Sequence, residues 1–154
     1  PSFTYTRSGI YTVILTVTGP GGTSTMARAM YITVRLPDIV TQSVDTPSSV
    51  RRGQNLRVNS ILKNEGNIST GKEFYVALYL RSTRNSKIKY YIGRYYVPNL
   101  GAGETNSNTS YFRISRNIPR GRYYVMAVAD HTRSINVSWR NKTIKYRIGS
   151  IRLY

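Results

Sequence analysis

Six carboxylates and one histidine are the side chains of this 154-residue chain best suited to acid–base catalysis or to binding a hard metal ion. The carboxylates lie in separate turns and strand ends, at Asp38, Asp45, Glu65, Glu73, Glu104 and Asp130, and the histidine is His131. No two carboxylates have the spacing of an acid–base pair, and a calcium site would need Asp45 or Glu65 brought to Asp130 by the fold. The absence of cysteine excludes thiolate nucleophiles and thiolate metal sites. We therefore expect no enzyme, no catalytic residue, no metal site and no cofactor.

Basic and aromatic side chains are abundant and could bind an anionic surface. The chain has 23 Lys and Arg against 6 Asp and Glu, which gives a formal net charge of +17, and it has 14 Tyr. Such a charge implies repulsion between copies unless an anionic partner neutralises it. The candidate contact residues are Tyr75, Tyr79, Arg81, Arg84, Lys87, Lys89 and Arg94. We expect an acidic glycan or an acidic surface-layer partner there, and no specific nucleic acid, because no nucleic-acid-binding motif is present.

Four Asn-x-Ser/Thr sequences could accept N-linked glycans, at Asn67, Asn108, Asn136 and Asn141. We expect all four at loops or strand ends, where a glycan could extend into water. Together they support an extracellular glycoprotein, and an unmodified chain is the equal alternative, because the pattern also arises by chance in a chain rich in Asn and Ser.

The elements that must position these residues are strands. Val, Ile, Thr and Tyr alternate with period two between turn signals, which is typical of an all-β sandwich. In the clearest run, Phe74, Val76, Leu78 and Leu80 are predicted to face inward, with Tyr75, Ala77, Tyr79 and Arg81 outward. Further strands are expected at 39–45, from 56 to about 64, at 88–97, around 112–114, at 123–129 and at 144–153. No apolar run approaches the roughly 20 residues of a membrane-spanning helix, and residue 1 is expected to lie inside a longer protein.

The first 36 residues contain a second alternating pattern. Residues 3–5 are Phe-Thr-Tyr, Gly9 follows, and residues 11–17 are Tyr-Thr-Val-Ile-Leu-Thr-Val. This order resembles the last part of a PKD domain, an immunoglobulin-like module of extracellular proteins, and predicts a partial PKD-like segment over residues 1–36. A hairpin cannot bury a core alone, so the apolar face of Tyr11, Val13, Leu15 and Val17 needs a cover. The missing part of the module, the following domain, or a neighbouring chain that accepts these strands could each supply it.

The remainder of the chain has five landmarks in order. They are residues 37–40 (Pro-Asp-Ile-Val), 62–66 (Leu-Lys-Asn-Glu-Gly), 74–80, 97–104 and 119–130. With them, residues 37–154 resemble a CARDB domain, the cell-adhesion-related sandwich of bacterial and archaeal surface proteins. The resemblance implies an immunoglobulin-like β-sandwich of about seven strands but no particular chemistry. Relatives usually have an acidic stretch after the position of Asp130, whereas residues 134–141 here have no carboxylate, so a cation site there is not expected.

These features predict an extracellular structural or adhesion module of a cell-surface or filament-forming protein. Self-association into a homo-oligomer or filament would use sheet faces and strand donation, since head-to-tail contacts form a filament unless they close into a ring. The alternative is a polyanion- or saccharide-binding accessory domain of a larger secreted protein. Salt discriminates the two, because it weakens polyanion binding strongly but does not screen buried apolar faces.

Overall fold

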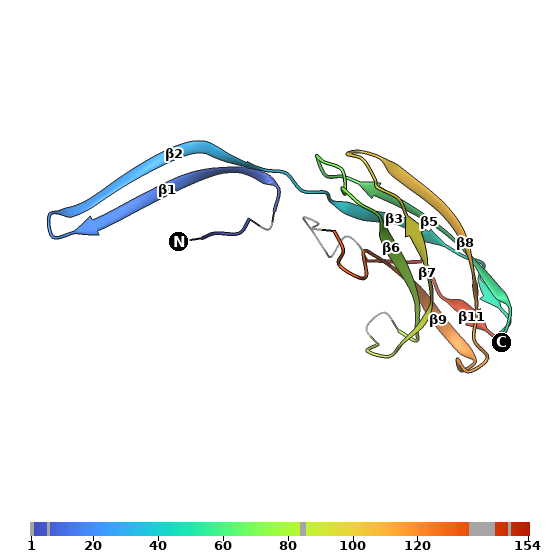
Figure 1. The fold of residues 1–154 in the computed structure, drawn as a ribbon. Coiled ribbons are helices and arrows are strands. Elements are labelled where there is room, and N and C mark those ends of the chain that lie inside the picture. The colour runs from blue at the N-terminus through green and yellow to red at the C-terminus, as the bar shows by residue number, and fades with distance from the viewer. Residues whose placement is uncertain (1, 6, 84–85, 136–143, 148) are drawn as a thin grey trace.

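The computed structural model describes residues 2–5, 7–83, 86–135, 144–147 and 149–154, and every regular element within these ranges is a β-strand. The strands are β1 (Gly9–Gly19), β2 (Gly22–Val34), β3 (Ile39–Asp45), β4 (Ser49–Val50), β5 (Asn55–Asn64), β6 (Phe74–Arg81), β7 (Lys89–Val97), β8 (Thr105–Arg113), β9 (Gly121–Ala129), β10 (Ile144–Tyr146) and β11 (Ile151–Leu153). Figure 1 shows that β1 and β2 form a long hairpin, here called the arm, which projects from a two-layered sandwich.

The two layers of the sandwich are a three-stranded sheet in the order β3-β5-β8 and a larger sheet in the order β4-β11-β9-β6-β7, with β10 also paired to β9. All pairs are antiparallel except β4 with β11. The all-β, immunoglobulin-like fold expected from the sequence is confirmed. The Tyr123 hydroxyl near the start of β9 donates a hydrogen bond of 2.9 Å to the Pro119 carbonyl, in the manner of the tyrosine corner of immunoglobulin-like domains.

The core lies between the two sheets, and β6 contributes its centre. Phe74, Val76, Leu78 and Leu80 are at most 1% exposed, as their alternation predicts. The buried positions of the other strands complete the core, chiefly Ile39, Leu56, Val58, Leu62, Val97, Phe112, Ile114, Val125, Ile151 and Leu153. Ala77 differs from the prediction, because it is fully buried although it faces away from the core. Its cross-strand partners, Arg94 on β7 and Val128 on β9, are much larger and flank its methyl group.

Two strand boundaries also differ from the prediction. β8 begins at Thr105, well before the apolar residues that indicated it, because backbone pairing with β5 holds the polar stretch 105–110 in the sheet. The expected strand 144–153 is divided into β10 and β11, which pair with opposite ends of β9. Gly149, with φ +78° between them, adopts a conformation that glycine takes without strain.

The arm joins the sandwich through residues 35–38, and the buried side chain of Asn64 holds this linker. Its Oδ1 accepts hydrogen bonds of 3.0 Å from the backbone N–H groups of Asp38 and Gly66. Its amide nitrogen donates to three carbonyls, those of Ile68 (2.8 Å), Leu100 (3.1 Å) and Gly101 (3.0 Å). One side chain therefore ties together the linker, the β5–β6 turn and the β7–β8 loop.

Gly66 allows the linker to approach this closely. A Cβ at this position would stand 2.5 Å from both the Asp38 nitrogen and the Leu36 carbonyl oxygen. Both atoms belong to the backbone and cannot move aside as a flexible side chain could. The 62–66 landmark is thus the attachment point of the arm.

Candidate interaction surfaces

The first face of the arm carries the predicted self-association residues. Tyr11, Val13, Leu15 and Val17 alternate along β1, and Met26 lies opposite Leu15 on β2. Leu15 is 60% exposed and Val17 58% exposed, whereas Tyr11 and Val13 are half-buried. The sandwich does not cover this face in the described chain, so the hypothesis that the following domain shields it is wrong (Figure 1).

The second face of the arm is also open. Ile10 and Ile14 are exposed there, beside a ladder of threonine pairs in which Thr16 and Thr25 hydroxyls lie 3.2 Å apart. Among the described strands, β1 and β2 pair only with each other, so both outer edges of the hairpin keep unpaired backbone groups. An apolar ribbon with two open edges is the kind of element that strand addition completes.

The base of the arm is covered by the N-terminal segment. The Phe3 and Tyr5 ring centroids are 4.9 Å apart, and those of Tyr5 and Tyr11 are 4.6 Å apart. The Tyr11 hydroxyl donates to the Arg7 carbonyl at 3.0 Å. Tyr11 therefore makes its contacts within the chain, and the exposed apolar part of the first face on β1 consists of Leu15 and Val17.

The predicted tyrosine–cation cluster lies on the outer face of β6 and β7. The guanidinium of Arg94 lies over the Tyr75 ring, 4.3 Å from its centroid, and the ammonium of Lys89 lies 4.5 Å from the Tyr79 centroid. Edge contacts to Tyr96 and Tyr91 across the strand pair extend the row, with centroid separations of 5.9 and 5.7 Å. Alternate tyrosines and cations form a continuous surface.

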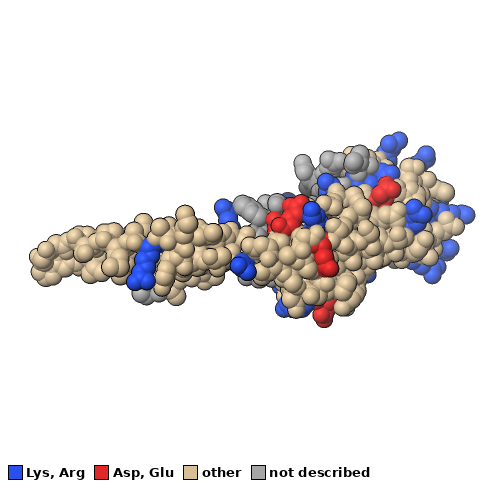
Figure 2. Space-filling view, turned by 90° about the horizontal axis from the view of Figure 1, so that it is seen from above, with Lys and Arg blue, Asp and Glu red and all other residues tan. Residues whose placement is uncertain are grey.

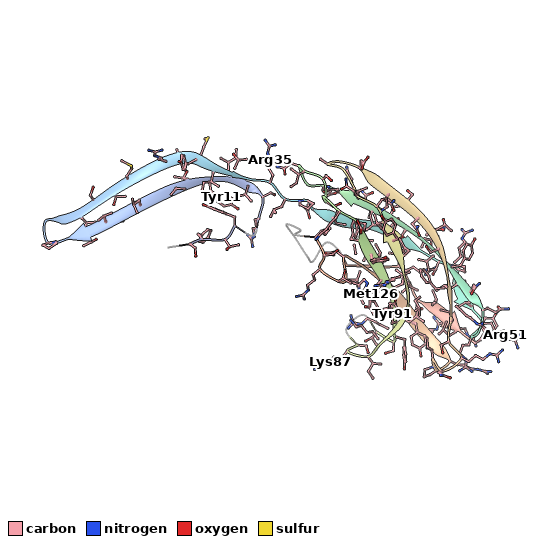
Figure 3. The ribbon with its side chains drawn as sticks, in the orientation of Figure 1. Tyr11, Arg35, Arg51, Lys87, Tyr91 and Met126 are labelled. Carbon is pink, nitrogen blue, oxygen red and sulfur yellow. The ribbon has the colours of Figure 1, made fainter. Side chains whose placement is uncertain are left out.

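The remaining members of this predicted set lie toward the β6–β7 loop. The Arg81 guanidinium donates to the Met126 sulfur at 3.9 Å and to the Ser86 carbonyl, which turns its charge toward the loop. Lys87 is exposed in that loop (Figure 3). Arg84 lies outside the described residues. The structure therefore brings the tyrosine rings and Arg81 together. The cations already have partners within the chain, because Lys89 and Arg94 lie over tyrosine rings and Arg81 donates to the Ser86 carbonyl.

The predicted glycosylation positions differ in their surroundings. Asn67 is exposed in the turn after β5. Asn108 lies within β8, opposite the buried Ser60, and its Oδ1 accepts a hydrogen bond of 2.5 Å from the Ser110 hydroxyl. The expectation that every site falls at a loop or strand end is therefore wrong for Asn108, since polar side chains at 105–110 suggested a loop. Asn136 and Asn141 lie outside the described residues.

The Asp130 carboxylate accepts hydrogen bonds from the turn that follows it. Its Oδ1 accepts hydrogen bonds from the Ser134 N–H at 2.6 Å and the Ser134 hydroxyl at 2.9 Å. In the described residues, no group of three or more His, Cys, Asp or Glu side chains could hold a metal ion. Burial lowers the pKa of His131, repulsion from Arg94 lowers it further, and neighbouring Asp130 opposes both effects.

Two tyrosines of the sandwich have raised pKa values. Burial raises the pKa of Tyr95 to about 12, and this effect outweighs that of the 2.6 Å hydrogen bond with the Ser60 hydroxyl, which lowers the pKa. Burial also raises the pKa of Tyr123, repulsion from Tyr90 adds to this effect, and Arg52 opposes it. Both hydroxyls therefore stay protonated and serve as structural hydrogen-bonding groups.

One basic surface was missed by the sequence-based prediction. Three segments meet at the end of the sandwich remote from the arm: loops 51–54 and 114–120 and residues 152–154. Their arginines surround a pocket of about 420 Å³. A sequence signal was present, because residues 46–64, 105–129 and 131–154 contain no Asp or Glu. The three segments are distant in the sequence, so their meeting depended on strand topology.

Comparison with known proteins identifies the sandwich. A family model named CARDB matches residues 36–141. A CARDB domain from Pyrococcus furiosus, solved in complex with two metal ions, is 18% identical, with a TM-score of 0.56 over 80% of this chain and 93% of that one. A domain from a candidate cell-surface protein of Methanosarcina acetivorans is 17% identical, with a TM-score of 0.55 over 77% of this chain and 93% of that one.

A third similar structure is a β-glucosidase from Erythrobacter marinus, which is 17% identical with a TM-score of 0.52. The match covers 84% of this chain but 17% of that enzyme, so the likeness concerns one domain of it. No curated protein matches the chain significantly. Among the described residues, no helix is long and apolar enough to cross a membrane.

Proposed function

Because this chain belongs to the CARDB family, whose domains occur in cell-surface proteins, we propose that it is an extracellular structural or adhesion module that associates with further copies of itself. The role is mechanical and not catalytic, and the sandwich serves as a folded spacer that holds the arm. The arm is the C-terminal part of a PKD-like module, as its sequence resemblance implies.

The observation that carries this proposal is the exposed apolar arm. Leu15, Val17 and Met26 form an exposed apolar patch on the first face. Ile10 and Ile14 are exposed on the second face, where threonines separate them from further apolar side chains. With strands of 11 and 13 residues, the arm is roughly 40 Å long. An isolated two-stranded hairpin is marginal in water, so a second layer or added strand stabilises it. A second copy of this chain supplies that layer, with the arms packed face to face.

Two arm variants test this assignment, with native material examined by electron microscopy and size-exclusion chromatography. Leu15→Asp places a carboxylate in the apolar patch of the first face, opposite Met26, where docking would strip it of water, and should abolish assembly. Thr16→Asp adds the same charge at the adjacent position but on the other face, and should assemble normally. Assembly should also persist at high salt, because apolar contacts are not screened.

Two results would overturn the self-association proposal. One is assembly that is unchanged when residues 1–36 are deleted or when Leu15→Asp is introduced. The other is native material that stays monomeric at every concentration, which would assign the cover of the arm to another part of the same protein. For the glycoprotein hypothesis, the intact mass of native material should exceed that of the bare polypeptide, and an equal mass would contradict it.

A further inference from the structure

Among the described residues, seven arginines surround the end of the sandwich remote from the arm, here called the arginine end. They are Arg51, Arg52, Arg113, Arg116, Arg120, Arg122 and Arg152, and all but the half-buried Arg52 are exposed. Figure 2 shows basic side chains gathered at this end, and Figure 3 places Arg51 at its tip. The surface is separate from both the arm and the tyrosine–cation row.

Hydrogen bonds donated by Arg52 to backbone carbonyls hold the loops of the arginine end in place. The Arg52 Nη1 donates to the carbonyls of Arg116 (2.9 Å) and Ile118 (3.1 Å), which links the β4–β5 loop to the β8–β9 loop. The Arg52 N–H donates to the Tyr154 carbonyl at 2.9 Å. Gly53 has φ +87°, and a Cβ there would stand 2.9 Å from the Arg116 Nε. The arginines thus project from a fixed base, which reduces the entropy lost when a ligand binds.

Two neighbouring hollows provide space for anionic groups. The first, about 420 Å³, is lined by Arg51, Arg52, Arg116 and Arg120. The second, about 540 Å³, is lined by Arg120 together with Arg122 and Arg152. Arg120 and Tyr154 line both hollows. This pairing suits a ligand that carries successive anionic groups along one chain better than a single small ion.

The segments that build this end carry basic but no acidic side chains. Residues 46–64, 105–129 and 131–154, which build it, contain no Asp or Glu. Guanidinium groups are planar and present forked N–H donors that match the paired oxygens of sulfate, phosphate and carboxylate. An anionic polymer would relieve the repulsion among the arginines and release its own counterions on binding.

We propose that the arginine end binds an acidic polysaccharide through its sulfate or carboxylate groups. Single-stranded nucleic acid fits this surface less well, because its bases need successive aromatic side chains for stacking. The lining of the two hollows contains one aromatic residue, Tyr154, which is 51% exposed. A saccharide ring can pack on this ring while its anionic substituents reach the arginines on either side.

The test compares two triple variants that remove the same charge. Arg51→Ser/Arg116→Ser/Arg120→Ser removes arginines of the first hollow and leaves Arg52 to hold the loops. Arg35→Ser/Lys63→Ser/Lys72→Ser removes three cations near the arm, at the opposite end of the sandwich, and serves as the control. Binding of the native chain and both variants to heparin, to polygalacturonate and to a single-stranded oligonucleotide is measured over a range of salt concentrations, and circular dichroism verifies folding.

The first triple variant should bind at least about tenfold more weakly to the favoured polysaccharide, and its dependence on salt should become less steep by up to about three ion equivalents. The control should stay within about twofold of the native affinity, since long-range attraction is screened at physiological salt. Preference for heparin assigns sulfate as the recognised group, and preference for polygalacturonate assigns carboxylate.

Three outcomes would overturn the inference. Equal loss in both triple variants would mean that only net charge matters, and an unchanged affinity in the first variant would mean that the arginines do not bind. Tighter binding of the oligonucleotide than of either polysaccharide would assign the surface to nucleic acid. Deletion of residues 1–36 should leave polysaccharide binding intact, so failure of the self-association proposal would not affect this one.

Discussion

Strands β1 and β6 have nearly the same pattern of side chains but opposite surroundings. The apolar positions of β1 include Leu15 and Val17, which are more than half exposed, whereas Leu78 and Leu80 on β6 are completely buried. β6 is flanked by β7 and β9 and is covered by the facing sheet, while β1 has one neighbouring strand in the described chain and is covered only at its base, by the N-terminal segment. Alternation of apolar residues therefore specifies that a face requires cover, but it does not specify which element provides it.

The largest expected effect is the loss of stability when a core side chain of β6 is truncated, compared with truncation of an apolar side chain of β1. Phe74→Ala should lower the free energy of unfolding of the sandwich by about 3–5 kcal/mol, because it leaves a cavity in a close-packed core. Leu15→Ala, in the arm, should change it by less than about 0.5 kcal/mol, since this side chain touches little in the single chain. Denaturant unfolding followed by circular dichroism, at concentrations where the chain is monomeric, measures both. Similar losses would show that the arm is covered within one chain.

The next prediction concerns the joint between the two regions. Asn64→Ala should destabilise the sandwich by about 2–3 kcal/mol, because it leaves the Asp38 N–H and several carbonyls without their buried partner. Amide hydrogen exchange at residues 36–38 should accelerate at the same time. Asn55→Ala, on an exposed position of the same strand, is the control and should have little effect. Unchanged exchange in the linker would mean that other contacts position the arm.

A smaller loss of stability is expected when a buried polar group of the sandwich is removed. Tyr95→Phe removes the hydrogen bond to Ser60 and should cost about 1 kcal/mol at neutral pH. The unfolded chain releases the tyrosine proton near pH 10, whereas folding raises the pKa of Tyr95 to about 12. Stability conferred by this group is therefore full below pH 10 and is lost as the pH rises to 12. Between pH 9 and 12, the free energy of unfolding should decline less steeply with pH for Tyr95→Phe than for the native chain. Equal slopes would contradict the raised pKa of Tyr95 in the folded state.

The smallest expected effect is at His131. Because the pKa of His131 is lowered in the folded state, the unfolded chain binds more protons just below pH 6.5. The stabilising contribution is therefore full above this pH, decreases as the pH falls toward the folded-state pKa, and then levels off. His131→Gln should reduce the loss of stability between pH 7.5 and 5 in urea unfolding experiments. An identical pH profile in the variant would assign acid sensitivity to the carboxylates.

Much of the sandwich could be predicted from sequence, because its strands obey a local rule. The bounds of β3 at Ile39–Asp45 and the inward residues of β6 follow from period-two alternation, and both are confirmed. The start of β8 could not be predicted in this way, since polar residues such as Asn have low strand propensity and this stretch joins the sheet through its pairing with β5. Ala77 was missed for a related reason, because its burial depends on the size of its cross-strand neighbours.

The candidate surfaces also divide into one that the local sequence predicts and one that depends on how the strands are connected. The tyrosine–cation row is encoded in two consecutive strands, so residues such as Tyr75 and Arg94 could be grouped from their spacing. The arginine end draws Arg51, Arg116 and Arg152 from three separate segments, and the sequence contained only the signal that carboxylates are absent from each. Sequence patterns identify surfaces built by neighbouring strands, whereas surfaces built by distant loops require the topology.

The attachment of the arm at Asp38 also determines how the sandwich bears tension. A pull on the arm enters β3 at its first residues and acts along that strand, toward the arm and away from the chain end at Tyr154. The hydrogen bonds between β3 and β5 lie across this direction, so the pairs from Ile39 to Asp45 are loaded together in shear instead of opening one after another. The Asn64 contact to the Asp38 N–H adds a further bond at the point where the force enters. A pull that enters through the arm would therefore load the β3–β5 hydrogen bonds together and would not open them one at a time.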